Sequence, residues 1–241
     1  MSAQAKPEAL VVAGTKAAPS PPGDVAGVAL HDAIAAVLAR TDRCSVALAG
    51  GTTPKVAYAH LVQLDARAAK KLLPRVDFYF GDERCVAADH ADANYKMARA
   101  ALGADAKLQR IEGERKDRDE AARAYERVLP AALDILVLGI GEDGHTASLF
   151  PGSPALSEKT RRVVAIDGAP KPPPERITIT PVAIEAARRI IMIATGAAKA
   201  EPVQRAIEGP WKPEETPAQL ARRGTWILDE AAARLIARSL A

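Results

Sequence analysis

The stretch at residues 134–151, DILVLGIGEDGHTASLFP, constrains the fold and the function of this chain more than any other. Its first part, residues 134–141, is a continuous apolar run, as expected of a parallel strand covered on both faces. Glycines then end the run and bring Asp143 and His145 to the end of the strand. Because ligands of open α/β sheets bind at the carboxyl ends of the strands, we expect both side chains in a binding site.

Strand-like and helix-like segments alternate along the chain, which predicts an α/β fold with an open, mainly parallel, Rossmann-like sheet and helices on both faces. With 241 residues, 48% of them hydrophobic, the chain can bury a large core, and we expect one domain over residues 1–241. The expected strands are 10–12, 45–49, 76–80, 134–141, 162–166, 177–180, 190–194 and 225–228. The expected helices are 24–40 with Asp24 as N-cap, 54–64, 95–102, 119–129, one from 181, 197–208 and 230–239, with loops at 17–23 and 167–174.

Charge and hydropathy exclude several classes of protein. The 33 basic and 30 acidic residues are spread through the sequence, so no basic block is available to neutralise the phosphates of nucleic acid. The apolar runs are shorter than the roughly 18 residues that span a bilayer, and the chain does not begin like a signal peptide. Cys44 and Cys85 are too few for a disulfide framework. We expect a cytoplasmic protein that binds neither nucleic acid nor membranes, as a monomer or small homo-oligomer.

A second candidate site element, AGGTTPK at residues 49–55, lies between an expected strand and an expected helix. Gly50 and Gly51 allow a tight turn, Thr52 offers a hydroxyl, and Pro54 suits the first position of a helix. Free backbone N–H groups at such a helix N-terminus attract anions. The segment matches neither a Walker A loop nor a dinucleotide fingerprint, and taken alone it is equally consistent with an ordinary strand-to-helix turn.

A third element follows the expected strand 76–80, where Gly81 precedes Asp82, Glu83 and Arg84. A carboxylate at the end of a sheet can accept hydrogen bonds from sugar hydroxyls, and a guanidinium can bind phosphate with two N–H groups. The alternative is a salt-bridged loop in which Arg84 only neutralises one of the acids, and without other context this is the more frequent situation.

Taken together, these elements resemble the 6-phosphogluconolactonase family, over nearly the whole chain. That family is similar in fold to the glucosamine-6-phosphate deaminases. The chain has Ala87 and Ala88 where the family often has prolines, and Ala49 where the glycine loop often begins with serine, and both differences are peripheral to the chemistry. The matching stretches are AGGTTPK at 49–55, GDERCV at 81–86, NY at 94–95, GIGEDGHTASLFPG at 139–152, PPPERITIT at 172–180 and TGAAKA at 195–200.

The resemblance implies hydrolysis of 6-phospho-D-glucono-1,5-lactone to 6-phosphogluconate, the second step of the oxidative pentose phosphate pathway. Water must lose a proton as it attacks the lactone carbonyl, and the leaving ring oxygen must gain one. Histidine serves both transfers because its unperturbed pKa of about 6.5 lies near working pH. His145 is therefore the expected general base and acid, and Asp143 is expected to orient its imidazole. Ser148 is a weaker candidate nucleophile because no GxSxG elbow surrounds it.

The resemblance also implies the residues that bind the sugar phosphate. Arg176 follows the PPP loop, and Lys199 begins an expected helix, where a cation opposes the helix dipole unless an anion lies nearby. Asp82 is expected to contact the sugar. No cofactor and no metal are expected, because the four histidines are scattered without metal-ligand spacing. The residues expected around the phosphate are Gly50, Gly51, Thr52, Arg84, Arg176 and Lys199.

Two other functions are considered. A deaminase or isomerase of the glucosamine-6-phosphate type would use the same glycine loop and DGH turn, with Asp82 as the base. The segment after His145 lacks the carboxylate that the deaminase pattern places shortly after its histidine. A sugar-phosphate sensor on the same fold would need a DNA-binding module, and the segment before Asp24 is too short to contain a helix-turn-helix.

Overall fold

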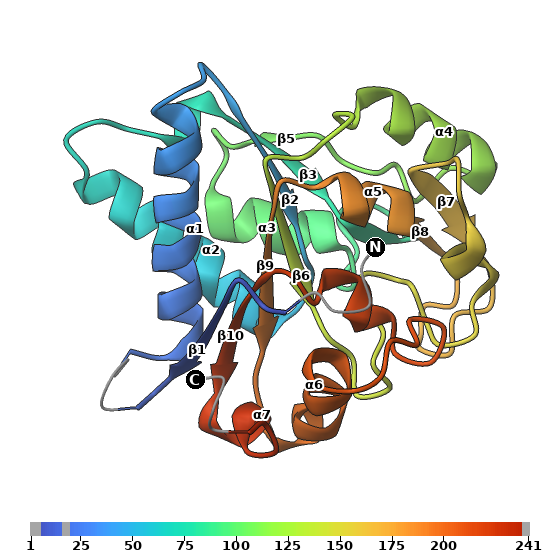
Figure 1. Cartoon of the computed structure of the whole chain (residues 1–241). Coiled ribbons are helices and arrows are strands. Elements are labelled where there is room, and N and C mark those ends of the chain that lie inside the picture. Colours follow the sequence, from blue (N-terminus) through green and yellow to red (C-terminus); the bar gives the residue numbers. More distant parts are fainter. Residues whose placement is uncertain (1–5, 16–19, 238–241) are drawn as a thin grey trace.

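A seven-stranded parallel sheet forms the centre of the computed structural model, which describes residues 6–15 and 20–237 (Figure 1). The strand order is β1-β10-β9-β6-β2-β3-β5, and helices cover both faces. The predicted α/β class and parallel sheet are therefore confirmed. The strands are β1 (Ala9–Ala13), β2 (Cys44–Leu48), β3 (Val76–Phe80), β5 (Lys107–Leu108), β6 (Ile135–Gly139), β9 (Arg189–Ala194) and β10 (Thr225–Asp229).

The direction of the connections decides which face each helix covers. The chain first runs from β1 toward β5 and then returns, and right-handed crossovers place the helices of the two runs on opposite faces. The first run contributes α1 (Pro22–Leu38), α2 (Thr52–Arg67) and α3 (Asn94–Leu102). The return contributes α4 (Arg118–Val128), α5 (Pro181–Ala186) and α6 (Ala200–Ile207), and α7 (Glu230–Ala233) follows β10. The 3-10 turns are η1 (Leu73–Arg75), η2 (Pro154–Ser157), η3 (Ala197–Lys199) and η4 (Pro217–Ala221).

Three further strands form a separate antiparallel sheet in the order β4-β8-β7. They are β4 (Asp82–Arg84), β7 (Val163–Ile166) and β8 (Arg176–Ile179). Gly81 joins the two sheets, because its N–H donates to Leu48 of β2 and its carbonyl accepts from Ile179 of β8. The charged segment 82–84, expected to follow the strand 76–80 at the end of the sheet, is itself a strand whose residues pair with β8.

Several element ends differ from the sequence-based predictions. The prediction of Asp24 as an N-cap is wrong: α1 begins at Pro22, whose fixed φ suits a first helical residue, and Asp24 lies in the first turn. The predicted strand 134–141 ends at Gly139, and the predicted helix 197–208 is divided into η3 and α6. The helix predicted to reach 239 ends at Ala233. The last residues of that prediction, and 17–19 of the predicted loop, lie outside the described residues.

The core consists of the strands and of the helix faces turned to them, and most strand residues are buried. Trp226 is fully buried in this core, whereas Trp211 is half-buried beside the Arg222 guanidinium. Cys44 and Cys85 are both free thiols. In the part of the chain that the structure describes, no helix has the length and apolar character needed to cross a membrane.

Two buried tyrosines fix the strand ends from which the candidate site is built. The Tyr58 hydroxyl accepts a hydrogen bond from the Ala49 N–H at 2.8 Å and donates to the carbonyl of the same residue at 2.9 Å. Tyr125 makes the same pair of bonds with Phe80, at 2.6 and 2.9 Å. Each hydroxyl satisfies backbone groups that the ladder leaves free where β2 and β3 end.

We expect Tyr58→Phe to lower the free energy of unfolding by about 1–3 kcal/mol, because it leaves a buried N–H and a buried carbonyl without a partner. Urea denaturation followed by circular dichroism measures the change. Tyr95→Phe is the matched control, since the Tyr95 hydroxyl makes no hydrogen bond within residues 6–15 and 20–237. Equal stability of the two variants would contradict the bridging role of Tyr58.

Candidate active site

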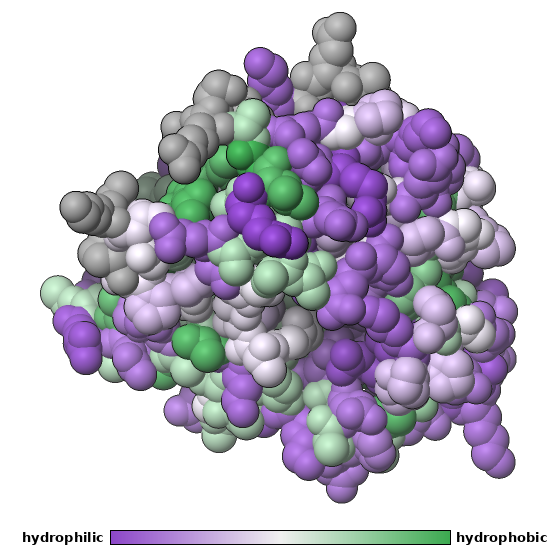
Figure 2. Space-filling model, turned by 90° about the horizontal axis from the view of Figure 1, so that it is seen from below, coloured by the Kyte–Doolittle hydropathy of each residue, from purple (hydrophilic) through white to green (hydrophobic). Residues whose placement is uncertain are grey.

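The predicted site residues gather in two adjoining pockets at the carboxyl edge of the parallel sheet. The first, here called the histidine pocket, is a cavity of about 160 Å³. Asn94, which was not predicted as a site residue, lines this pocket too. The predicted residues that line it are Gly50, Gly51, Asp82, Arg84, His145 and Arg176. Figure 2 views the molecule from below, from the side on which α6 and α7 lie, and shows hydrophilic residues over much of that face.

The second pocket, here called the lysine pocket, has a volume of about 260 Å³ and is lined by Thr52 and Lys199 among others. Gly50 and Gly51 line both pockets, as do Gly139 and Ile140. The two cavities therefore share a wall made of the glycine loop after β2 and the end of β6. Of the nine residues predicted for the site, only Asp143 lines neither pocket.

Asp143 instead contacts His145 directly. The turn after β6 is closed by hydrogen bonds from Gly144 N–H to Gly141 O at 3.0 Å and from Gly141 N–H to His145 O at 2.8 Å. It brings His145 Nδ1 to 2.5 Å from Asp143 Oδ1, and the ring of Phe150 packs with its centroid 4.5 Å from that of the imidazole. Because the carboxylate accepts the Nδ1 proton, a neutral imidazole here has Nε2 free to accept another.

The pKa of His145 lies below its usual value of 6.5. Burial is the main cause, and it outweighs the attraction of the Asp143 carboxylate, which acts in the opposite direction. The imidazole is therefore neutral at pH 7. The pKa of Asp143 is also lowered: burial opposes ionisation, but the charge and hydrogen bonds of His145 favour it more.

A buried cluster of polar side chains forms the floor of the histidine pocket. The carboxylate of Asp82 accepts hydrogen bonds from the Ser148 hydroxyl at 2.6 Å and from the Asn94 amide at 3.2 Å. Arg176 Nη1 lies 3.9 Å from the same carboxylate. Ser148 is thus bonded to Asp82 and not to His145, so it lacks the base that a serine nucleophile needs.

The two arginines of the histidine pocket differ in how many donors remain free. Arg176 is buried, which lowers its pKa, and its guanidinium donates to the carbonyls of Lys171, Pro172 and Pro173 at 3.1, 3.2 and 2.7 Å. Arg84 donates through Nη1 to Asp92 O at 2.5 Å, and its buried Nε has no partner among the described residues. Arg84 is therefore the arginine with donors available to a ligand.

Glu83 and Asn94 lie in segments that the sequence singled out, but neither was predicted as a site residue, and both shape the site. The Glu83 carboxylate is buried and accepts hydrogen bonds from the backbone N–H groups of Arg84, Asn94 and Tyr95 at 2.8, 2.7 and 2.8 Å. Burial raises the pKa of Glu83 to about 7, although these three bonds favour the carboxylate. The available signal was the absence of a capping side chain just before α3, which leaves its first N–H groups for a distant acid.

The lysine pocket lies at the N-terminus of α2. Gly51 is the N-cap, with φ +114°, and neither a capping side chain nor an acidic residue occupies the first turn. The first N–H groups of this helix are therefore free to bind an anion. Lys199 precedes α6, its ammonium lies 3.9 Å from Glu142, and burial lowers its pKa. Within residues 6–15 and 20–237, no group of three or more histidine, cysteine or acidic side chains is placed to hold a metal ion.

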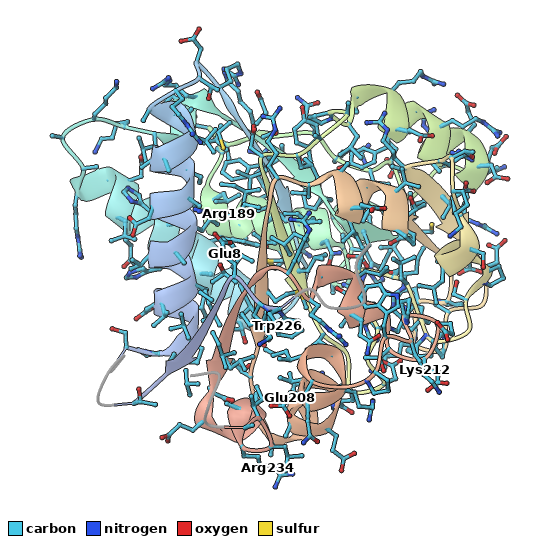
Figure 3. All side chains as sticks on the ribbon, in the orientation of Figure 1. Glu8, Arg189, Glu208, Lys212, Trp226 and Arg234 are labelled. Carbon is cyan, nitrogen blue, oxygen red and sulfur yellow. The ribbon has the colours of Figure 1, made fainter. Side chains whose placement is uncertain are left out.

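A larger cavity, of about 650 Å³, lies at the opposite edge of the sheet and is lined by several arginines. Two of these arginines form ion pairs: Arg188 Nη1 lies 2.6 Å from Asp134, and Arg189 lies 3.6 Å from Glu8 (Figure 3). Arg223 donates to carbonyls at the end of α5. We therefore place the candidate active site at the carboxyl edge, where an acid–base pair faces unoccupied donors, and not in this larger cavity.

Comparison with known proteins gives consistent results. Residues 24–228 match the sequence model of a family described as glucosamine-6-phosphate isomerases/6-phosphogluconolactonase. The chain is similar to the 6-phosphogluconolactonase of Mycobacterium tuberculosis, with 39% identity over 202 residues, which are 76% of this chain and 81% of the relative. Its structure is similar to that of 6-phosphogluconolactonase from Trypanosoma brucei, with a TM-score of 0.82, 28% identity, and coverage of 97% and 100%. A monomeric glucosamine-6-phosphate deaminase shares the fold, with a TM-score of 0.78, 22% identity, and coverage of 94% and 99%.

We expect Gly141→Ala to disrupt the contact between Asp143 and His145, because the added Cβ would lie 2.0 Å from His145 Nδ1 and 2.5 Å from Asp143 Oδ1. Crowding of this kind costs about 1–3 kcal/mol of stability. Urea unfolding measures the loss, and the downfield proton signal of the hydrogen-bonded imidazole should disappear from the NMR spectrum. Gly139→Ala is the control, since its nearest contact would be an ordinary 3.8 Å. A retained imidazole signal in the Gly141 variant would contradict the expectation.

Proposed function

The chain belongs to the glucosamine-6-phosphate isomerase/6-phosphogluconolactonase family, and we propose that it is a lactonase that hydrolyses 6-phospho-D-glucono-1,5-lactone to 6-phosphogluconate. The observation that supports this most is the neutral His145, held by Asp143 and facing a pocket that shares its wall with an anion-binding helix N-terminus. The similarity to proteins named 6-phosphogluconolactonase favours the same substrate.

In this proposal His145 performs both proton transfers. Its free Nε2 takes a proton from water as the water oxygen bonds to the lactone carbonyl carbon, and the carbonyl electrons move onto the carbonyl oxygen. When the tetrahedral intermediate collapses, the bond to the ring oxygen breaks and the imidazolium returns the proton to that oxygen. Asp143 holds the imidazole in the required tautomer and stabilises its charged form between the two steps.

The phosphate of the substrate is assigned to the wall that the two pockets share. Gly50, Gly51 and Thr52 offer backbone N–H groups there, at the start of α2. Arg84 lines one pocket and Lys199 the other, so a phosphate on this wall would lie between two cations. The sugar ring would then occupy the histidine pocket, where Asp82 can accept a hydrogen bond from a hydroxyl.

The deaminase alternative would require Asp82 to act as a base. Ser148 and Asn94 both donate to this carboxylate, and Arg176 lies nearby. These contacts occupy the carboxylate oxygens with donors of the protein itself, which fits a side chain that positions other groups better than one that takes a proton from a substrate. We also propose that the protein is cytoplasmic, because its two cysteines are free thiols and the cytoplasm is a reducing compartment. The state of assembly, a monomer or small homo-oligomer, stays a prediction.

We expect His145→Ala to lower kcat by roughly 10²- to 10⁴-fold while leaving the fold intact, because it removes the general base and acid. The lactone is generated in situ by its dehydrogenase, and the acceleration over uncatalysed opening is measured, with glucosamine 6-phosphate as the parallel substrate. His31→Ala is the control, since the two histidine side chains are similarly exposed, at 21% for His31 and 19% for His145. Near-normal turnover of the His145 variant would reject the assignment.

We expect kcat/KM of the wild-type protein to fall at acid pH with a midpoint below 6.5. The general base must be unprotonated, and burial lowers the pKa of His145 from that value, so activity is lost only when the pH falls through the lowered pKa. The profile is measured with the uncatalysed rate subtracted at each pH. A midpoint above 6.5 would show that the base is another group.

A further inference from the structure

Asn94 is buried in the wall of the histidine pocket, with 2% of its surface exposed, at the start of α3. Its backbone N–H donates to the Glu83 carboxylate at 2.7 Å. Its side-chain NH₂ group donates to Asp82, to the backbone carbonyl at 2.9 Å and to the carboxylate at 3.2 Å. The backbone and the side chain of Asn94 are therefore both held in place.

The contacts with Asp82 decide how the amide of Asn94 is oriented. Both groups of Asp82 are acceptors, and an amide oxygen in place of Nδ2 would meet only other oxygen atoms. Nδ2 therefore faces Asp82, and Oδ1 lies against the glycine loop. A Cβ on Gly50 would lie 2.1 Å from Oδ1, so this oxygen occupies the space that a side chain at position 50 would need.

The Oδ1 atom of Asn94 lacks a hydrogen-bond donor. In the part of the chain that the structure describes, the two hydrogen bonds of the side chain are those of Nδ2, and Oδ1 is not among the side-chain atoms sealed from solvent. Because Gly50 beside it also lines the histidine pocket, Oδ1 opens to that pocket. An acceptor left unpaired in a buried residue is costly, and it indicates a donor from outside the protein.

The chemistry of the pocket favours a hydroxyl as this donor. The guanidinium groups of Arg84 and Arg176 line the pocket together with the carboxylate of Asp82, so a cationic donor would meet net repulsion. A neutral O–H group carries no such penalty. The proposed substrate, a 1,5-lactone, keeps free hydroxyls at C2, C3 and C4, between the carbonyl at His145 and the phosphate on the shared wall.

We propose that Asn94 Oδ1 accepts a hydrogen bond from one ring hydroxyl of the bound lactone and so selects substrates that carry this hydroxyl. The inference rests on the proposed function. Because Nδ2 is engaged by Asp82, the amide offers the substrate an acceptor and no donor, so a hydroxyl fits and a methylene leaves Oδ1 unpaired. Asn94 takes no part in the proton transfers of His145, and it fixes the position of the ring.

The test compares the parent lactone with three analogues that lack the hydroxyl at C2, C3 or C4. Each catalysed rate is divided by the uncatalysed opening of the same lactone, because loss of a hydroxyl also changes the reactivity of the carbonyl. We expect one analogue to lower kcat/KM of the wild-type protein by roughly 10-fold, since it leaves Oδ1 without a donor. In Asn94→Ala, kcat/KM for that analogue and for the parent lactone should agree within about two-fold, because the partner of the hydroxyl is gone.

Ser148→Ala is the matched control. Ser148 donates to the Asp82 carboxylate at 2.6 Å, as Asn94 does at 3.2 Å, but it is not one of the described residues that line the histidine pocket. This variant therefore disturbs Asp82 and leaves Oδ1 in place, so it should keep the roughly 10-fold discrimination between the two lactones. Asn94→Ser, which also lacks Oδ1 but keeps a hydroxyl as donor, provides a second variant if circular dichroism shows that Asn94→Ala does not fold.

The proposal fails if an active wild-type protein opens all three analogues within about two-fold of the parent lactone. It also fails if the Asn94 variants discriminate as strongly as Ser148→Ala, because the hydroxyl would then bind another group. A wild-type protein that does not accelerate opening of the parent lactone would instead reject the proposed function, and with it the substrate that this inference assumes.

Discussion

The buried carboxylate of Glu83 is the interaction on which the geometry of the candidate site depends. It joins β4 to the N-terminus of α3 by accepting three backbone N–H groups, which offset much of the cost of burying a charge. Asn94, held in this way, donates to Asp82 on one side and abuts the glycine loop on the other. A Cβ on Gly50 would lie 2.1 Å from the Asn94 side-chain oxygen. One acid thus sets the spacing between the small sheet, α3 and the glycine loop.

The parts of the fold that the sequence predicts well are those that depend on local pattern. The apolar run before Gly139 could only be a buried strand, and Asp143 and His145 meet because a short turn places residues two apart side by side. The strand β4 was missed because its residues are charged, and what stabilises it is contacts distant in sequence: Glu83 with α3, and Asp82 with Ser148. No periodicity in the sequence reports such contacts.

The same distinction applies to the cations. Arg84, Arg176 and Lys199 were predicted to surround one phosphate. They instead lie in two pockets, and most donors of Arg176 bind the backbone carbonyls of residues 171–173. The number of charged residues around a cavity is also a poor guide to function here: the arginines of the cavity at the opposite edge pair with acids and with the end of a helix.

The wall between the two pockets consists of Gly50, Gly51, Gly139 and Ile140, so a ligand that crosses it meets mostly bare peptide. A wall with few side chains offers little to discriminate between ligands by the shape of their substituents. In the proposed function, a phosphate bound at the start of α2 would leave His145 at one set distance along the ligand, so the wall would select ligands by their length. A sugar acid shorter or longer by one carbon would present its carbonyl before or beyond the imidazole. The glycines of this wall would therefore set the length of carbon chain that the site accepts between the phosphate and the carbonyl.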